Sequence, residues 1–324
     1  MIATERIAGL DTLRGLGILL VVMSHSGFGG DWMLYASIIH VPIFYLVAGY
    51  LFKDEATYGA MVSEKLRRIV VPYLFYSLLG LGVYVVGNCL LLHKPFDGGH
   101  FDVLSAERYQ LPYIASLWFF ESIFWCFAIF GLVRRAVADQ RLVAAIVLLL
   151  GIVGWTLSRT ASLPLSIDTS LSWLPLFYVG NLLRRIDVGS RLLQGKYAIA
   201  GAVVAVAGAI LYVAAGCRPG YCYNVILGNV LLNVVLTMAV TLGMLALCCR
   251  VGRVPLLSFL GRNSLTIFAG HQVVGIMFVC GLKSLGVEVD GGVMPWLIVL
   301  VTIAGALAIG WIVRKVAPVL IAER

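Results

Sequence analysis

The fold class is decided by two stretches near the start of the chain: GLDTLRGLGILLVVMSHSGFGG (residues 9–30) and IIHVPIFYLVAGYLF (residues 38–52). Both belong to apolar runs of the kind that crosses a bilayer, for which a helix needs about twenty residues. Each nevertheless holds ionisable side chains, Arg14 and His25 in the first and His40 in the second. An ionisable group inside a membrane segment is energetically costly, so these residues indicate function and predict partners.

Apolar residues dominate the whole chain. Of its 324 residues, 61% are hydrophobic and 12% are charged, whereas about a quarter of the residues in a typical soluble domain are charged. A soluble domain could not bury so much apolar surface. A membrane protein can, because lipid covers its outside and helices satisfy their own backbone. We predict an all-α, polytopic integral membrane protein, with a single domain over residues 1–324.

The apolar pattern predicts about ten transmembrane helices. The clearest spans are 197–215 and 294–313, and Pro175 predicts that the sixth helix is kinked or only partly spanning. Pro255 and Gly261 are interpreted as a break before the ninth helix. The ten helices are expected near residues 10–27, 34–52, 69–92, 113–133, 142–158, 171–184, 197–215, 223–249, 263–286 and 294–316.

The net charge of +8 is spread over short loops. This scatter favours membrane orientation over nucleic-acid binding, so lipid is an expected partner and nucleic acid is not. With the N-terminus in the cytoplasm and ten helices, nearly all loop cations lie inside. We therefore predict that both termini are cytoplasmic, in the inner membrane of a bacterium. The cations left for the outside are Lys94, Arg108, Arg159, Arg218 and Lys283.

Two predicted outside loops contain residues that could form a metal site or a disulfide. The loop 93–112 contains two histidines and three acidic residues, but no pair has helical metal-ligand spacing, so an exposed polar loop is favoured and no metal is expected. Cys217 and Cys222 lie in another outside loop, where an oxidising compartment would permit a disulfide. Two unpaired thiols remain the alternative.

Arg14 and His25 are eleven residues apart, just over three helical turns, so they share one face at a separation of about 16 Å. Arg14 is then near the cytoplasm and His25 lies deep, toward the outside. This arrangement suits a long ligand with an anionic head and a reactive tail, such as acetyl-CoA. The alternatives are a snorkelling arginine that sets topology and a structural histidine bonded to a neighbouring helix.

The arginine–X10–histidine spacing of Arg14 and His25 resembles the signature of the membrane acyltransferase 3 family. The second stretch is similar to a motif of the branch related to fucose 4-O-acetylases, although Val41 and Ala48 replace its usual methionine and serine. Later landmarks also resemble the family: EKLRRIVVPYLFYS (64–77), SLWFF (116–120), LPLFYVGNLLRR (174–185) and FLGRNSLTIFAGHQVV (259–274).

The resemblance implies ten helices and transfer of an acyl group, usually acetyl from cytoplasmic acetyl-CoA, to hydroxyls of envelope sugars or other small molecules. His25 would be the essential histidine and Arg14 its signature partner. His40 and His271 match later family histidines, and a basic cluster would meet the CoA phosphates: Lys65, Arg67 and Arg68.

Acyl transfer to a hydroxyl needs a group that takes the acceptor proton, and histidine titrates in the useful range. We hypothesise that His25 deprotonates the acceptor or carries the acyl group transiently, and that His40 or Glu121 orients it or shuttles the proton. Glu121 has the alternative of a structural ion pair or hydrogen bond. His271 and Trp118 are assigned to acceptor binding, with interhelical bonding the alternative for His271.

Two other classes of protein compete with the acyltransferase. A transporter or flippase of an envelope precursor would share ten helices and buried polar residues, but would typically show inverted repeats, and none is evident. A structural or signalling membrane protein would leave Arg14 and His25 without a role.

Overall fold

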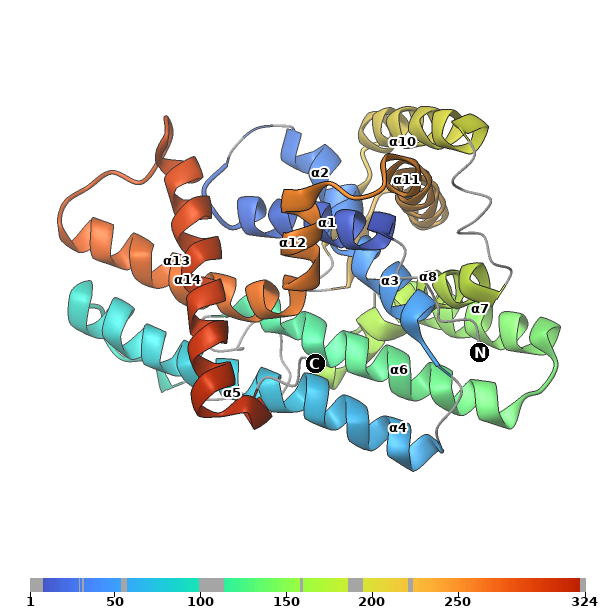
Figure 1. The fold of residues 1–324 in the computed structure, drawn as a ribbon, viewed down its shortest axis with the longest axis horizontal. Helices are drawn as coiled ribbons and strands as arrows, with labels where there is room; N and C mark the ends of the chain where they lie inside the picture. Colours follow the sequence, from blue (N-terminus) through green and yellow to red (C-terminus); the bar gives the residue numbers. More distant parts are fainter. Residues whose placement is uncertain are drawn as a thin grey trace.

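The computed structural model describes residues 8–28, 30, 32–53, 57–98, 114–157, 160–185, 195–220 and 224–320, which are mostly helical (Figure 1). The main helices are α1 (Ala8–Ser24), α2 (Trp32–His40), α3 (Pro42–Leu51), α4 (Tyr58–Lys65), α5 (Val71–Val83), α6 (Trp118–Ala136), α7 (Gln140–Leu157), α8 (Ile167–Arg185), α10 (Gly195–Ala214), α11 (Val230–Val251), α12 (Pro255–Arg262), α13 (Ser264–Ser284) and α14 (Met294–Val316).

Shorter elements join these helices. Two π-helical stretches, η1 (Leu66–Val70) and η2 (Tyr84–Leu91), continue α4 and α5 into one long helix. Three 3₁₀ turns are η4 (Ala115–Leu117), η5 (Pro164–Ser166) and η7 (Pro318–Leu320). An antiparallel hairpin of β1 (Arg218–Gly220) and β2 (Val225–Leu227) precedes α11.

Within the described residues, seven helical segments are long and apolar enough to cross a membrane. Every one of the ten predicted segments is helical over much of its length, but three fall outside these seven. α1 has 17 residues, the second segment is divided between α2 and α3, and α8 carries charged residues at both ends. The count of ten crossings therefore stays a prediction. The seven segments are Tyr58–Leu91, Ala115–Ala136, Gln140–Leu157, Lys196–Ala214, Val230–Val251, Ser264–Ser284 and Met294–Val316.

Two details refine the predictions. The predicted break before the ninth helix lies between Val251, the last residue of α11, and Pro255, which begins the separate short helix α12, because proline fits the first turn of a helix, whose N–H groups have no intrahelical partner. The eighth predicted helix was expected from residue 223, whereas α11 begins at Val230. Asn229 caps this start, because its side-chain oxygen accepts from the N–H of Leu232 at 3.0 Å. Over the described residues, the fold is therefore helical with one small hairpin.

The interior is built around helices that approach at glycine. α1 packs against α12, α3 against α8, α10 against α11, and α14 crosses α13 (Figure 1). In the α3–α8 pair, Gly49 faces the backbone of Phe177 and Gly180 faces the backbone of Leu46. Small residues at a crossing let two membrane helices come close enough for their backbones to touch. The pairing helps to bury α8, most of whose side chains are inaccessible to solvent.

We expect Gly180→Ala to destabilise the protein by about 1–3 kcal/mol, because the added methyl group would overlap backbone atoms of Leu46 and Tyr50 that cannot rotate away. Thermal unfolding in detergent, followed by tryptophan fluorescence, measures the effect. Gly82→Ala is the matched control, since its methyl group would enter open space on α5. Equal melting temperatures for the two variants would contradict the close approach of α3 and α8.

Basic residues meet at one end of the bundle. Arg184, at the end of α8, donates to the carbonyl oxygen of Phe52 at 2.7 Å, just beyond α3. Arg135, at the end of α6, lies over the ring of Tyr58 at the start of α4, 5.8 Å from its centroid. The ends of α3, α6 and α8 and the start of α4 thus lie together. The loops that follow or precede these helix ends are the ones that the charge pattern assigns to the cytoplasm.

Candidate active site

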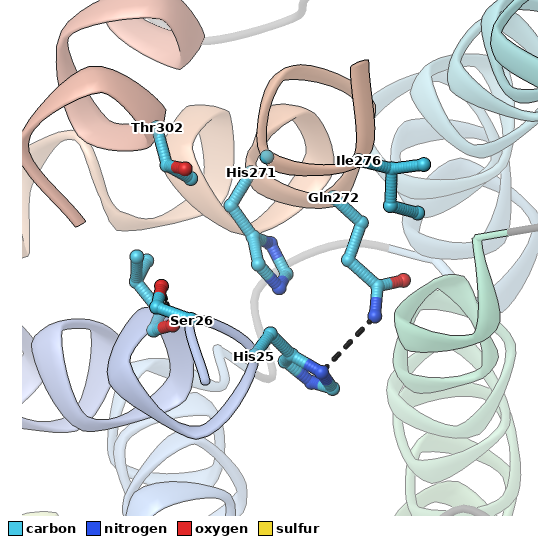
Figure 2. Close-up of a pocket in the computed structure, with 8 residues that line it drawn as sticks. His25, Ser26, His271, Gln272, Ile276 and Thr302 are labelled. Atoms are coloured by element: carbon cyan, nitrogen blue, oxygen red, sulfur yellow. Dashed lines mark hydrogen bonds between the residues drawn. The ribbon is translucent and has the colours of Figure 1, made fainter. Parts of the chain in front are cut away.

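A cavity of about 240 Å³ lies where the end of α1 meets α13 and α14 (Figure 2). We call it the histidine cavity, after the two histidines in its wall. Their rings are 5.3 Å apart between centroids and tilted by 45°. The cavity is lined by Val22, His25 and Ser26 from the α1 end, by His271, Gln272, Gly275 and Ile276 from α13, and by Thr302 from α14.

The local sequence holds His25 at the mouth of this cavity. α1 ends at Ser24, and the next turn is closed by the N–H of His25 donating to the carbonyl oxygen of Val22 at 3.1 Å. Ser26 donates its hydroxyl to the same carbonyl oxygen at 2.7 Å, and Gly27 has a φ of +79° that lets the chain leave the helix. The helix end therefore satisfies its carbonyl groups locally and leaves the His25 ring for the cavity.

Gln272 connects His25 to the 3₁₀ turn η4, just before α6. Its side-chain oxygen Oε1 accepts from the N–H of Ser116 at 2.9 Å, and its Nε2 lies 3.2 Å from Nδ1 of His25, as the dashed line in Figure 2 shows. Ser116 and Gln272 are both buried. The amide thus joins three segments far apart in sequence and fixes the position of the His25 ring.

His271 is 1% exposed, and its ring nitrogen Nδ1 lies 2.7 Å from the carbonyl oxygen of Phe268. Its other nitrogen, Nε2, is buried and has no hydrogen-bond partner among the described residues. The hydroxyl of Thr302, in the same cavity wall, is also buried and has no hydrogen-bond partner among the described residues. Buried polar groups are nearly always bonded, so two such atoms facing one cavity indicate a ligand site.

Arg14 and His25 both face α13. Arg14 donates to the hydroxyl of Ser264 at 2.7 Å, at the first residue of α13, and lies 3.9 Å from a carboxylate oxygen of Asp11. His25 contacts Gln272, two turns further along the same helix. The two helices therefore run in the same direction, and Arg14 and His25 lie on one side of α1, as their spacing predicts.

His40 lies at the end of α2, with its Nδ1 3.0 Å from the carbonyl oxygen of Ser37. It does not line the histidine cavity, but both it and His271 are near enough to His25 for their charges to interact. The predicted role of His40 in orienting His25 stays a prediction.

Glu121 lies away from the cavity wall. Its two carboxylate oxygens accept from the hydroxyl groups of Tyr73 at 2.7 Å and Ser166 at 3.0 Å. Leu165 and Ser166 have φ values of +55° and +53°, which are unfavourable for side chains other than glycine. The carboxylate therefore holds α5, α6 and the strained turn before α8 together, which supports the structural alternative.

We expect Glu121→Ala to lower stability, because two buried hydroxyl groups lose their acceptor, at a cost of about 1–3 kcal/mol each. Glu121→Gln, which keeps one acceptor oxygen, should lie between alanine and the wild type. Melting temperature and transfer rate of the folded fraction are measured together. A loss of rate in Glu121→Gln at unchanged melting temperature would instead support the proton-shuttle role.

The remaining predicted residues lie elsewhere. Lys65 ends α4 with its Nζ over the ring of Phe127, 4.4 Å from the centroid. Arg68 pairs with Glu64 at 3.0 Å, and Arg67 is exposed, so this basic segment remains accessible in part. Trp118, the first residue of α6, is buried and is not part of the cavity wall.

Three further features concern the start of α13, possible metal ligands and the cysteine pair. Asn263, just before α13, donates its amide back to the carbonyl oxygen of Phe259 at 3.0 Å and makes no side-chain capping bond to α13. Among the described residues, no cluster of three or more His, Cys, Asp or Glu could hold a metal ion. The Cys217–Cys222 pair cannot be judged, since Cys222 lies outside the described residues, as does most of the loop 93–112.

Sequence reasoning missed Gln272 and Thr302. Gln272 had a usable signal, because an amide next to a histidine in an apolar helix is itself costly in a membrane. Thr302 had none, since a threonine in an apolar helix usually bonds a carbonyl of its own helix.

The long apolar helices and the polar cavity between them define a multi-pass membrane protein with a candidate site for acid–base chemistry. Comparison with known families gives the particular class. The family model described as an acyltransferase domain, acyltransferase 3, matches residues 7–315, and the chain therefore belongs to this family. Neither a curated protein nor a solved structure matches the chain.

Proposed function

We propose that this membrane acyltransferase moves an acetyl group from cytoplasmic acetyl-CoA to a hydroxyl group of an envelope sugar or another small acceptor. The proposal places the protein in a bacterial inner membrane, with ten crossings and both termini inside. Membership of the acyltransferase family carries the reaction class. The family resemblance of residues 38–52 favours envelope sugars as acceptors, by analogy with the fucose 4-O-acetylase branch.

One observation carries the location of the chemistry: a cavity with two histidines, two turns along α13 from the residue that binds Arg14. Arg14 is suited to an anionic group, because a guanidinium makes charge-assisted hydrogen bonds to phosphate. A donor that reaches from Arg14 to His25 would bring its acyl group to the cavity. Lys65, Arg67 and Arg68 extend the phosphate site of this proposal toward the cytoplasm.

Imidazole is the natural proton acceptor for the reaction, since a positioned histidine typically contributes a factor of about 10²–10⁴ to the rate. The sequence alone assigns this role, or that of a transient acyl carrier, to His25. The cavity adds His271, whose Nε2 is buried beside it.

The experiment that tests the function is thiol release from acetyl-CoA by the purified protein in lipid nanodiscs. We expect saturable binding of acetyl-CoA, and release of CoA that accelerates when an extract of envelope glycans is added. Absence of any acetyl-CoA binding would contradict the proposal and favour transport of an envelope precursor instead.

A further inference from the structure

The hydrogen bonds around the histidine cavity determine which ring nitrogen of each histidine carries the proton. A backbone N–H can only donate, and a backbone carbonyl oxygen can only accept. A neutral imidazole has one N–H and one lone pair, so fixing one nitrogen fixes the other. Both cavity histidines are connected, directly or through one amide, to such a backbone group.

For His25 the chain of bonds begins at Ser116. Its backbone N–H donates to Oε1 of Gln272, which fixes the orientation of the amide. The amide nitrogen of Gln272 then faces Nδ1 of His25 at 3.2 Å and can only donate to it. Nδ1 therefore holds the lone pair, and the proton of neutral His25 is on Nε2. His25 offers the reaction an N–H group, while its lone pair is engaged.

For His271 the order is reversed. Nδ1 lies 2.7 Å from the carbonyl oxygen of Phe268 and must donate to it. The lone pair of neutral His271 is therefore on Nε2, the buried nitrogen in the cavity wall that has no partner among the described residues. An unsatisfied buried acceptor costs about 1–3 kcal/mol, and a hydroxyl group in the cavity would remove that cost.

The hydroxyl of Thr302 is the other group in the cavity wall that has no partner within the described part of the chain, and Figure 2 shows it on α14, on the other side of His271 from Gln272. Opposite it on α13 is Gly275, where a methyl group would come within 3.1 Å of this hydroxyl oxygen. A ligand with two neighbouring hydroxyl groups can satisfy His271 and Thr302 together. This chemistry is that of a sugar or polyol.

We propose that His271 is the catalytic base for the acceptor hydroxyl and that His25 acts as the hydrogen-bond donor to the acyl carbonyl. Gln272 is a positioning residue that sets the His25 proton, and Thr302 holds the neighbouring hydroxyl. This inference rests on the proposed function and changes the division of roles within it, because the sequence gives the base to His25.

The step balances as follows. Nε2 of His271 takes the proton of the acceptor hydroxyl as its oxygen bonds to the acyl carbon. The carbonyl oxygen gains negative charge, which the Nε2–H of His25 stabilises. The carbon–sulfur bond then breaks, the carbonyl re-forms, and the CoA thiolate takes the proton from His271. The products are the acetyl ester and CoA, and both histidines return to their starting states.

The first test reads the protons directly by ¹⁵N NMR of histidine-labelled protein in nanodiscs, at mildly alkaline pH where histidine is neutral. His25→Asn and His271→Asn assign the signals by their loss. We expect the proton of His25 on Nε2 and that of His271 on Nδ1. Gln272→Glu places an acceptor oxygen beside His25 and should move its proton to Nδ1. The opposite pattern in the wild type would overturn the inference.

The second test measures transfer of radiolabelled acetyl from acetyl-CoA to envelope glycans extracted from cells that lack the gene. His271→Asn keeps a donor for the Phe268 carbonyl but removes Nε2, and should slow transfer at least about 100-fold. Binding of acetyl-CoA should change less than about threefold, since His271 meets the acceptor side. His93→Asn is the matched control, because His93 is exposed and its φ of +52° suits asparagine.

His25→Gln separates the two histidines further. Glutamine can place an N–H near the former Nε2, so it should transfer about tenfold faster than His25→Ala if His25 is a donor, whereas glutamine is no base. Transfer by folded His271→Asn at the wild-type rate, or equal rates for His25→Gln and His25→Ala, would overturn the division of roles. A wild-type protein that binds no acetyl-CoA would instead contradict the proposed function itself.

Discussion

His25→Ala is expected to slow acyl transfer at least about 100-fold while acetyl-CoA still binds. The ring lines the cavity and interacts with both Gln272 and His271, so its removal takes away a group next to the reacting atoms. As a hydrogen-bond donor, base or acyl carrier alike, such a group contributes a factor of about 10²–10³ or more. Thiol release with glycan extract present measures the rate, and isothermal titration measures donor binding.

The control for this loss of activity is a measurement of the stability of His25→Ala. His25 is at the exposed end of α1, so alanine removes few packing contacts and the melting temperature should stay near the wild-type value. His93→Ala, at the other exposed histidine among the described residues, should leave the rate unchanged. Full transfer by well-folded His25→Ala would remove the histidine cavity from the reaction.

Arg14→Ala should weaken acetyl-CoA binding about ten- to a hundredfold and alter acceptor binding little. The guanidinium lies two turns before the cavity along α13, where an anionic donor group would meet it. Loss of hydrogen bonds to a charged group costs about 1.5–3 kcal/mol, and each 1.4 kcal/mol is tenfold in Kd. Isothermal titration with acetyl-CoA and with desulfo-CoA gives the constants.

Ser264→Ala is the matched control for Arg14. It removes the hydroxyl that accepts from Arg14 at 2.7 Å but leaves the positive charge in place. We expect its effect on acetyl-CoA affinity to be within about threefold, because the charge and not its neighbour binds the donor. A stronger effect of Arg14→Ala on acceptor binding than on acetyl-CoA binding would contradict the assignment of Arg14 to the anionic end of the donor.

The sequence was sufficient for the course of the helices, since apolar length alone sets where they lie. It was insufficient where the effect of a proline or a polar group depends on its place in the helix or on the helices packed against it. Pro255 marks the predicted break but also starts the separate short helix α12, and Pro42 follows a break between α2 and α3 that a continuous apolar run conceals. The polar side chains of α8 are buried against other helices. A hydropathy scale scores them as polar and does not register this burial.

For the site, charge made the first residues easy to find. Arg14, His25 and His271 are ionisable groups in apolar helices, and their cost in lipid marks them. Gln272 and Thr302 are uncharged, so only their contacts reveal them. Glu121 shows the reverse case: its charge suggests chemistry, and its hydrogen bonds to Tyr73 and Ser166 favour the structural alternative, so its role as a proton shuttle stays a prediction.

The most direct measurement of the central claim is transfer of the acetyl label itself. Purified protein in nanodiscs is incubated with acetyl-CoA labelled in the acetyl group and with envelope glycans from cells that lack the gene. The account predicts that label enters the glycan fraction as a base-labile ester, with one CoA released per acetyl transferred, and that His25→Ala labels it at least about 100-fold more slowly. Binding of acetyl-CoA with no label in any acceptor fraction, or equal labelling by His25→Ala, would contradict it.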